Sequence, residues 1–257
     1  MTSQPVGKPE SALERTLKKG ILAAIAAIVI ATVFWLGRQS VLGSESAINT
    51  AFHQRYVVNH WENVEDNTRW LGTTAMKTPF DLWIYQEILY ETRPDVLIET
   101  GTHTAGSAYF YATVFDALGK GRVYTMDVVD FPKAQHPRIH FRLDSSTSDG
   151  TIEWIRSNIK PGERVMVSLD SLHEKEYVLA EMDRYSQFVT PGCYLVVEDT
   201  HLNGHPLRLA FTPAPGHEGP WEAVEAWLPR HPEFQRDRTR EKFGFTFNPG
   251  GWLKRVR

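Results

Sequence analysis

Cysteine is almost absent from this sequence, since Cys193 is its single representative among 257 residues. No intramolecular disulfide can form, which excludes a disulfide-stapled scaffold, and a zinc site built on cysteine ligands is excluded with it. Net charge is also small, at −3 from 28 basic and 31 acidic side chains. The composition, 42% hydrophobic and 23% charged, is that of an ordinary globular protein, so disordered and collagen-like chains are excluded as well.

The small net charge is unevenly distributed along the chain. Residues 1–43 contain five basic and two acidic side chains, a balance of +3, so the remaining residues carry about −6. A nucleic-acid-binding domain needs a basic surface, which the larger part of the chain does not offer. We therefore expect no nucleic-acid partner.

One long apolar run stands near the N-terminus. Residues 20–37 carry no charged side chain, and as a helix they span roughly 27 Å, just enough to cross a hydrocarbon core of about 30 Å. Lys18 and Lys19 flank the run on one side and Arg38 on the other. These flanks argue against a buried core helix. We predict a single-pass transmembrane helix over 20–37, preceded by a tail at 1–19.

A cleaved signal peptide is the alternative interpretation of the same run. Val41 and Gly43 are small residues of the kind that precede a cleavage site. After the run, we predict a linker and helical prelude over 38–77 and a catalytic domain over 78–257.

The rest of the chain alternates between strand-like and helix-like segments. This alternation predicts an α/β fold with a doubly wound sheet and helices on both faces. The tail 243–256 is expected to form an antiparallel hairpin that turns at Pro249-Gly250-Gly251. We expect the strands at 95–100, 122–128, 139–144, 164–170 and 194–199. We expect the helices at 79–92, 106–118, 152–159, 174–187 and 220–228.

The loop after the first predicted strand contains two glycines, Gly101 and Gly106, which allow a close approach to a ligand. It is not the GxGxxG dinucleotide fingerprint, and Ser107 stands where a phosphate-binding loop has its lysine, so a nucleoside triphosphatase is not expected. Glu99, which opens the loop, suits a ligand with positive charge. Asp127 follows Gly106 by 21 residues, where a carboxylate accepts hydrogen bonds from ribose hydroxyls. Together these features indicate a nucleoside cofactor without phosphates, of which S-adenosylmethionine is the common one.

Three further carboxylates follow the fourth and fifth predicted strands. Asp170, Glu198 and Asp199 are expected to converge, and clustered carboxylates need a cation, for which a hard ion such as Mg²⁺ is suited. The alternative is that Glu198 or Asp199 only caps the next turn. His173, three residues after Asp170, is either a surface histidine or a base near the metal.

At these residues the sequence resembles the cephalosporin hydroxylase/rhamnosyl O-methyltransferase family, over roughly residues 50–250. The resemblance is carried by NTRWLGTTAMKTPFDLWIYQEILYETRPDVLIETGTHTAGSA, GRVYTMDV, SLDSLH and LVVEDTH. It implies a Rossmann-like class I methyltransferase fold that binds S-adenosylmethionine, with Mg²⁺ held by Asp170, Glu198 and Asp199. The layout is also similar to that of catechol O-methyltransferase, in which a lysine base stands where this chain has His173.

We therefore predict a Mg²⁺-dependent O-methyltransferase that acts on a hydroxyl of a sugar, glycolipid or related secondary metabolite. Asp170 and His173 are the predicted catalytic residues. The alternatives are a non-catalytic scaffold of the same fold and, with less support because no G-x-S-x-G motif is present, a hydrolase. The oligomeric state stays open, a homo-oligomer included. The predicted cofactor-binding residues are Glu99, Gly101, Ser107, Asp127 and Asp144.

Two arguments about membrane topology oppose each other. Lys8, Arg15, Lys18 and Lys19 precede the apolar run and only Arg38 follows closely, which favours a cytosolic N-terminus and an exported catalytic domain. S-adenosylmethionine, however, is made and kept in the cytosol. We give the cofactor more weight and predict a catalytic domain tethered at the cytosolic face.

Overall fold

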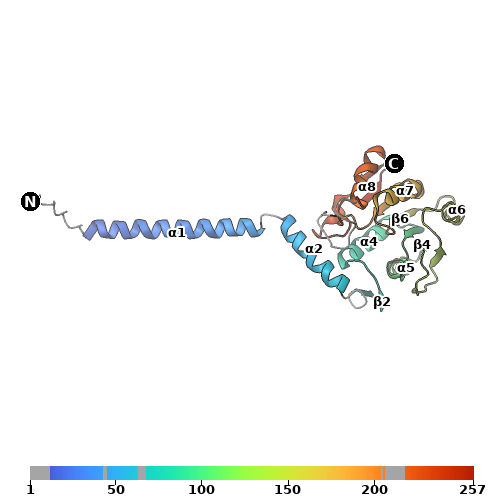
Figure 1. The fold of residues 1–257 in the computed structure, drawn as a ribbon, viewed down its shortest axis with the longest axis horizontal. Coiled ribbons are helices and arrows are strands. Elements are labelled where there is room, and N and C mark those ends of the chain that lie inside the picture. The colour runs from blue at the N-terminus through green and yellow to red at the C-terminus, as the bar shows by residue number, and fades with distance from the viewer. Residues whose placement is uncertain (1–11, 43–44, 63–67, 204, 206–217) are drawn as a thin grey trace, which may run out of the picture. The chain divides into compact units, whose positions relative to one another are not determined.

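A computed structural model describes residues 12–42, 45–62, 68–203, 205 and 218–257 (Figure 1). The chain divides into two units, residues 1–48 and residues 49–257. Residues 1–11 of the predicted tail lie outside the described residues. So do residues 43–44, which include the alternative cleavage position Gly43, and residues 63–67 of the predicted prelude.

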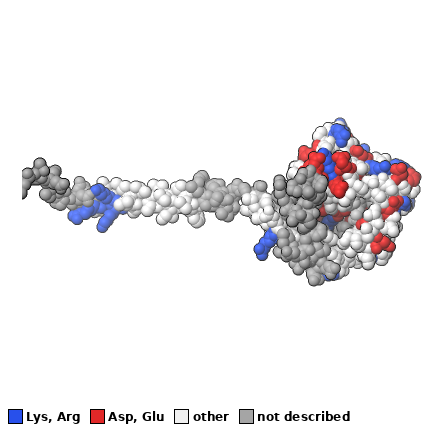
Figure 2. Space-filling model, in the orientation of Figure 1, with Lys and Arg blue, Asp and Glu red and all other residues white. Residues whose placement is uncertain are grey.

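The first unit contains helix α1 (Ala12–Leu42) and the start of α2 (Glu45–Glu62). Within the described residues, one segment, Arg15–Phe34, is long and apolar enough to cross a membrane, and none of it is buried. Lys18 and Lys19 lie early in α1 and are followed by an uncharged stretch (Figure 2). A signal sequence near an N-terminus passes the same test of length and composition, so the anchor stays a prediction.

The second unit is built on a seven-stranded mixed sheet with the strand order β5-β4-β3-β6-β7-β9-β8. The first five of these strands are parallel to one another, whereas β9 is antiparallel to both of its neighbours, β7 and β8. The predicted doubly wound α/β sheet is thereby confirmed. Its strands are β3 (Val96–Thr100), β4 (Arg122–Asp127), β5 (Ile139–Leu143), β6 (Val165–Leu169), β7 (Tyr194–Val197), β8 (Phe234–Arg236) and β9 (Trp252–Arg255).

Helices cover both faces of this sheet, because right-handed crossovers place α5, which leads to β4, opposite α7, which leads to β7. Helix α4 packs beside α5, and α7 packs beside α8 (Figure 1). The α-helices are α4 (Pro79–Thr92), α5 (Gly106–Leu118), α6 (Asp149–Asn158), α7 (Lys175–Tyr185) and α8 (Pro220–Trp227). Among the described residues of this unit, the short elements are β1 (Arg69–Trp70), β2 (Thr73–Thr74) and the 3₁₀ turns η1 (Ser186–Phe188), η2 (Leu228–Arg230) and η3 (Arg238–Glu241).

Local sequence explains where α4 begins and where the parallel strands lie. The side chain of Thr78 accepts a hydrogen bond from the Asp81 backbone at 3.0 Å, and Pro79 occupies the first turn, where its missing N–H costs nothing. All residues of β3, β6 and β7 are buried, as expected for parallel strands covered on both faces.

The predicted C-terminal hairpin is wrong in its first strand. An antiparallel pair is present, but β9 pairs with β8 and β7, and residues 243–248 form no strand. The reason is competition for their backbone: Phe247 N donates to the buried Asp81 carboxylate at 3.0 Å, and Phe247 O accepts from His201 N at 3.0 Å. The segment therefore forms part of a wall beside the carboxyl ends of the strands.

Candidate functional site

The loop after β3 approaches two other backbone segments so closely that only glycine fits. Gly101 has φ +81°, and a Cβ atom there would lie 1.9 Å from the carbonyl oxygen of Asp170. A Cβ atom at Gly106 would lie 1.9 Å from the carbonyl oxygen of Thr74. The two glycines thus let the loop contact both the end of β6 and the β2 region.

A cavity of about 750 Å³ opens at the carboxyl ends of the parallel strands, where ligands bind in sheets of this kind. Four of the five predicted cofactor-binding residues line it: Gly101, Ser107, Asp127 and Asp144. The predicted residues Asp170, His173 and Asp199 line the same cavity. The structure thus brings together residues from the ends of five strands.

Asp127 and Asp144 end neighbouring strands and differ in how their carboxylates are bonded. Asp127 accepts hydrogen bonds from the backbone N–H groups of His103 at 2.8 Å and Val129 at 3.0 Å, which fix the side chain at the cavity edge. The Arg142 guanidinium and the Ser148 hydroxyl hold the pKa of Asp144 at about 2. Asp144 is therefore ionised at any working pH.

Glu99 is the predicted cofactor residue that does not reach the cavity. Its side chain is fully buried, and Oε2 accepts a hydrogen bond from the Thr125 hydroxyl at 2.8 Å. Burial raises the pKa of Glu99 to about 8, so the group is mostly neutral at pH 7. Its hydrogen bond joins the end of β3 to β4, and its side chain does not face a ligand in the cavity.

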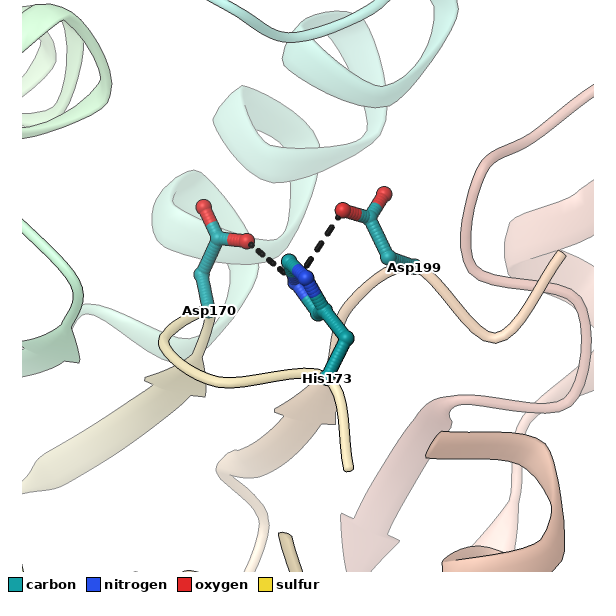
Figure 3. Close-up of side chains that lie close together, drawn as sticks. All are labelled: Asp170, His173 and Asp199. Carbon is teal, nitrogen blue, oxygen red and sulfur yellow. Dashed lines mark hydrogen bonds and ion pairs between the residues drawn. The ribbon is translucent and has the colours of Figure 1, made fainter. Parts of the chain in front are cut away.

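On the other side of the cavity, Asp170, His173 and Asp199 converge (Figure 3). The His173 Nε2 atom lies 3.4 Å from an Asp170 oxygen and 3.1 Å from an Asp199 oxygen. Burial lowers the pKa of His173, but the charge of Asp199 and the hydrogen bond to Asp170 outweigh this effect and raise the pKa to about 9. The two carboxylates therefore favour the protonated form of the ring.

Glu198 and Asp199 are adjacent in sequence but face different environments. Asp199 has φ +56°, and its backbone N–H donates to the Asn248 side chain at 3.0 Å, which turns its carboxylate toward the cavity. Glu198 is 2% exposed and points inward, where it accepts hydrogen bonds from Tyr85 and Ser168, both at 2.7 Å. The predicted metal set is therefore divided: Asp170 and Asp199 lie together, and Glu198 lies beneath them.

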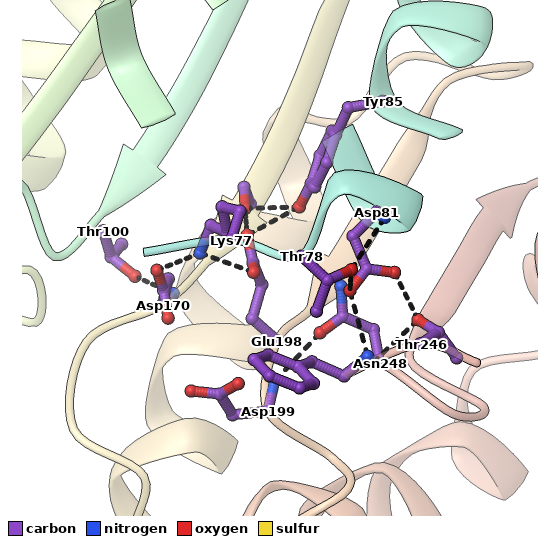
Figure 4. A network of polar contacts seen from close by, with 12 residues as sticks. Lys77, Thr78, Asp81, Tyr85, Thr100, Asp170, Glu198, Asp199, Thr246 and Asn248 are labelled. Atoms are coloured by element: carbon purple, nitrogen blue, oxygen red, sulfur yellow. Dashed lines mark hydrogen bonds and ion pairs between the residues drawn. The ribbon is translucent and has the colours of Figure 1, made fainter. Parts of the chain in front are cut away.

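Lys77 connects the two parts of the predicted metal set, Asp170 and Glu198 (Figure 4). The sequence alone did not indicate this role. Its ammonium group forms an ion pair with Asp170 and a second one with Glu198 Oε2 at 2.5 Å, and the side chain is only 6% exposed. Burial opposes the charge, but Asp170 and Glu198 raise the pKa of Lys77 well above its ordinary value. The signal was its position just before the helix cap Thr78, which alone does not distinguish it from a surface lysine.

His201 is a second cavity residue that the sequence interpretation missed. Its ring is stacked on Phe247 with the centroids 4.2 Å apart, and its Nδ1 atom lies 2.8 Å from the Phe247 carbonyl oxygen. Asp81 fixes that segment from the other side, since it accepts hydrogen bonds from the Thr246 hydroxyl at 2.5 Å and from Phe247 N (Figure 4). Burial lowers the pKa of His201 to about 4, so the ring is neutral at pH 7.

The sequence model of the rhamnosyl O-methyltransferase/CmcI family matches residues 62–256. The chain belongs to this family. The rhamnosyl O-methyltransferase of Mycobacterium leprae (strain TN) is 39% identical over 218 residues, which cover 81% of this chain and 91% of the relative. That of Mycobacterium tuberculosis (strain ATCC 25618 / H37Rv) is 37% identical over 218 residues, with 81% and 85% covered.

Solved structures of CmcI share the fold. An apo structure superposes with a TM-score of 0.57 at 21% identity and covers 74% of this chain and 77% of that one. A CmcI structure with Mg and S-adenosylmethionine gives 0.56 at 16% identity, with 77% and 84% covered. The predicted family, and with it the O-methyltransferase class, is confirmed. The predicted cofactors are the two that this CmcI complex contains.

Proposed function

We propose that this protein is a Mg²⁺- and S-adenosylmethionine-dependent O-methyltransferase that methylates a hydroxyl group of a sugar or glycolipid. The sugar is supported by the family and by the rhamnosyl O-methyltransferases that are 37–39% identical to this chain. A scaffold without catalysis has no need for Asp170, Asp199 and His173 in one cavity, and no observation favours a hydrolase.

The observation that carries this proposal is the order of side chains along the edge of the sheet. Asp144 follows β5, Asp127 is the last residue of β4, and the Gly101–Ser107 segment follows β3, whereas Asp170 follows β6 and Asp199 follows β7. Neighbouring strands lie about 4.8 Å apart, so this order separates two halves of one cavity. We assign the β5–β3 half to the cofactor and the β6–β7 half to the metal and the acceptor.

The donor set of the second half fits a divalent cation. One ligand atom from each of Asp170, His173 and Asp199 lies within 4.8 Å of the others, and the two carboxylates are 19% and 25% exposed, open to the cavity. Asp170 and Asp199 are the proposed Mg²⁺ ligands, because carboxylate oxygens suit this ion. Glu198, the third predicted ligand, joins them only if it leaves Lys77.

The chain's own residues then hold the acceptor and move its proton. Asp170 and Asp199 would hold Mg²⁺, which would supply Lewis acidity to the acceptor hydroxyl and would offset the negative charge that raises the pKa of His173. His173, once neutral, accepts the hydroxyl proton at Nε2. Asp127 and the Gly101 loop orient the cofactor, and since methyl transfer is an in-line displacement, this alignment supplies much of the acceleration.

Methyl transfer from tritium-labelled S-adenosylmethionine to p-nitrophenyl α-L-rhamnoside tests the proposal, with the full chain in detergent. We expect transfer in MgCl₂, loss of transfer in EDTA, and recovery when Mg²⁺ is restored. Asp199→Asn should reduce the rate by roughly 10²-fold or more. Asp149→Asn, which alters a 95% exposed carboxylate on α6, is the matched control and should leave the rate unchanged. Transfer that persists in EDTA would contradict the metal's role.

We further propose that the apolar segment of α1 anchors the catalytic unit at the cytosolic face of a membrane. The support is its length and composition together with the cytosolic supply of the methyl donor. Protease added to intact spheroplasts should leave the C-terminal unit uncut and should digest it after lysis. Digestion before lysis would show that the charge distribution around the helix, and not the cofactor, indicates the topology.

A further inference from the structure

His201 lies in the cavity and has no role in the proposed mechanism. It follows β7 by a few residues, is 3% exposed, and lines the cavity together with Leu202 and Phe247. The small exposed part of this residue therefore faces the cavity.

Contacts on several sides fix the orientation of the ring. Phe247 stacks on it with an interplanar angle of 17°, and the His53 ring lies 5.6 Å away. Nδ1 donates its hydrogen to the Phe247 carbonyl oxygen at 2.8 Å, and the same atom lies 3.6 Å from Asp199 Oδ1. Nε2 makes no hydrogen bond with any residue that the structure describes. It is also absent from the set of fully buried polar atoms that lack a partner. Nε2 is therefore the ring atom left for a ligand.

The position of His201 indicates which ligand it meets. The proposed cofactor residues lie at the carboxyl ends of β5, β4 and β3, and β6 separates these strands from β7, which precedes His201. Next to the ring, Leu202 and Phe247 form an apolar surface. A polar atom set in an apolar wall is suited to a sugar, which presents hydroxyl groups beside C–H faces.

We propose that His201 is an acceptor-binding residue, whose Nε2 atom forms a hydrogen bond with a sugar hydroxyl next to the one that is methylated. The inference rests on the proposed function, because it takes the acceptor to be a sugar. The bond exists in the ground state and in the transition state alike, so it lowers the KM for the acceptor and leaves kcat nearly unchanged.

Steady-state kinetics of the full chain with p-nitrophenyl α-L-rhamnoside test this role. His201→Phe should raise the KM for the rhamnoside about 10-fold, as expected for one lost hydrogen bond, and change kcat less than threefold. His201→Gln, whose amide reaches the position of Nε2, should restore KM to within about threefold of the wild-type value. An unchanged KM in His201→Phe, or no recovery in His201→Gln, would overturn the proposal.

Two further measurements separate this role from a structural one and from failure of the proposed function. His140→Phe changes an exposed histidine on β5 that does not line the cavity, and should leave KM unchanged; calorimetry should give the same S-adenosylmethionine affinity in all variants. If the wild type transfers no methyl group to the rhamnoside, the ¹⁵N resonance of His201 Nε2 is followed during rhamnoside addition. A shift of this resonance supports the contact between His201 and the sugar even though the proposed reaction fails. An unchanged resonance overturns the proposed contact.

Discussion

The buried ion pair of Lys77 offers a sharp test of the electrostatics beneath the cavity. Replacing Lys77 by Met keeps the length of the side chain and removes the cation from Asp170 and from Glu198, which is 2% exposed. Breaking a buried pair in this way costs about 3–5 kcal/mol of the free energy of unfolding. Lys242→Met is the matched control, because Lys242 pairs with Glu87 at 2.6 Å but is 46% exposed, so its loss should cost at most about 1 kcal/mol.

Urea unfolding of the full chain in detergent, followed by tryptophan fluorescence, measures both costs. Burial raises the pKa of Glu198 to about 7, and the charge of Lys77 opposes this rise. In Lys77→Met the folded-state pKa of Glu198 is therefore higher, so the carboxyl group takes up its proton earlier as the pH falls. The stability deficit should be smaller at pH 5.5 than at pH 8. Equal costs for the two variants, or a deficit that grows at low pH, would refute this reasoning.

Two further predictions concern the cavity walls. The pKa of His201 is lowered to about 4 by burial, whereas an unfolded imidazole titrates near 6.5, so protonation of the unfolded chain should remove about 3 kcal/mol of stability between pH 6.5 and 4. His201→Phe should lack this part of the pH dependence, and parallel stability curves for the two proteins would argue against a buried neutral ring. Gly119→Ala, at φ +73° with open space around the new Cβ, should cost about 1–2 kcal/mol in urea unfolding. Gly101→Ala should cost clearly more, because its Cβ would also meet the Asp170 carbonyl; similar costs would contradict the close approach.

The parallel sheet was predictable because its signals are local. Buried strands are short apolar runs bounded by polar residues, and the predicted strand at 164–170 differs from β6 (Val165–Leu169) by one residue at each end. The tail was not predictable in the same way. FGFTF alternates like a strand, but Phe245 packs on Phe52 with the rings 4.6 Å apart, and Asp81 binds the backbone of Phe247. Partners more than 160 residues away decide its conformation.

The candidate site, like the fold, was predictable only in part. Strand ends brought Asp127, Asp144, Asp170 and Asp199 to one cavity, as periodicity and strand order predict. The positive φ of Asp199, which turns its carboxylate toward the cavity while Glu198 stays buried, has no signal in the sequence pair Glu-Asp.

Lys77 shows why sequence spacing could not supply the rest. It lies 93 residues from Asp170, and only the folded chain brings its ammonium group to that carboxylate. The raised pKa of His173 has the same origin, since it depends on Asp199 from another strand.

The central claim is that one cavity holds the cofactor in its β5–β3 half and the metal in its β6–β7 half. Calorimetric titration of Asp127→Ala and Asp199→Asn, each with S-adenosylmethionine and separately with Mg²⁺, tests it most directly. We predict that Asp127→Ala weakens cofactor binding by about 1–3 kcal/mol and leaves Mg²⁺ affinity unchanged, because the ribose hydroxyls lose their charged acceptor. Asp199→Asn should weaken Mg²⁺ binding and leave the affinity for S-adenosylmethionine unchanged. If either variant weakens the binding of both ligands equally, or changes the binding of neither ligand, the division of the cavity is wrong.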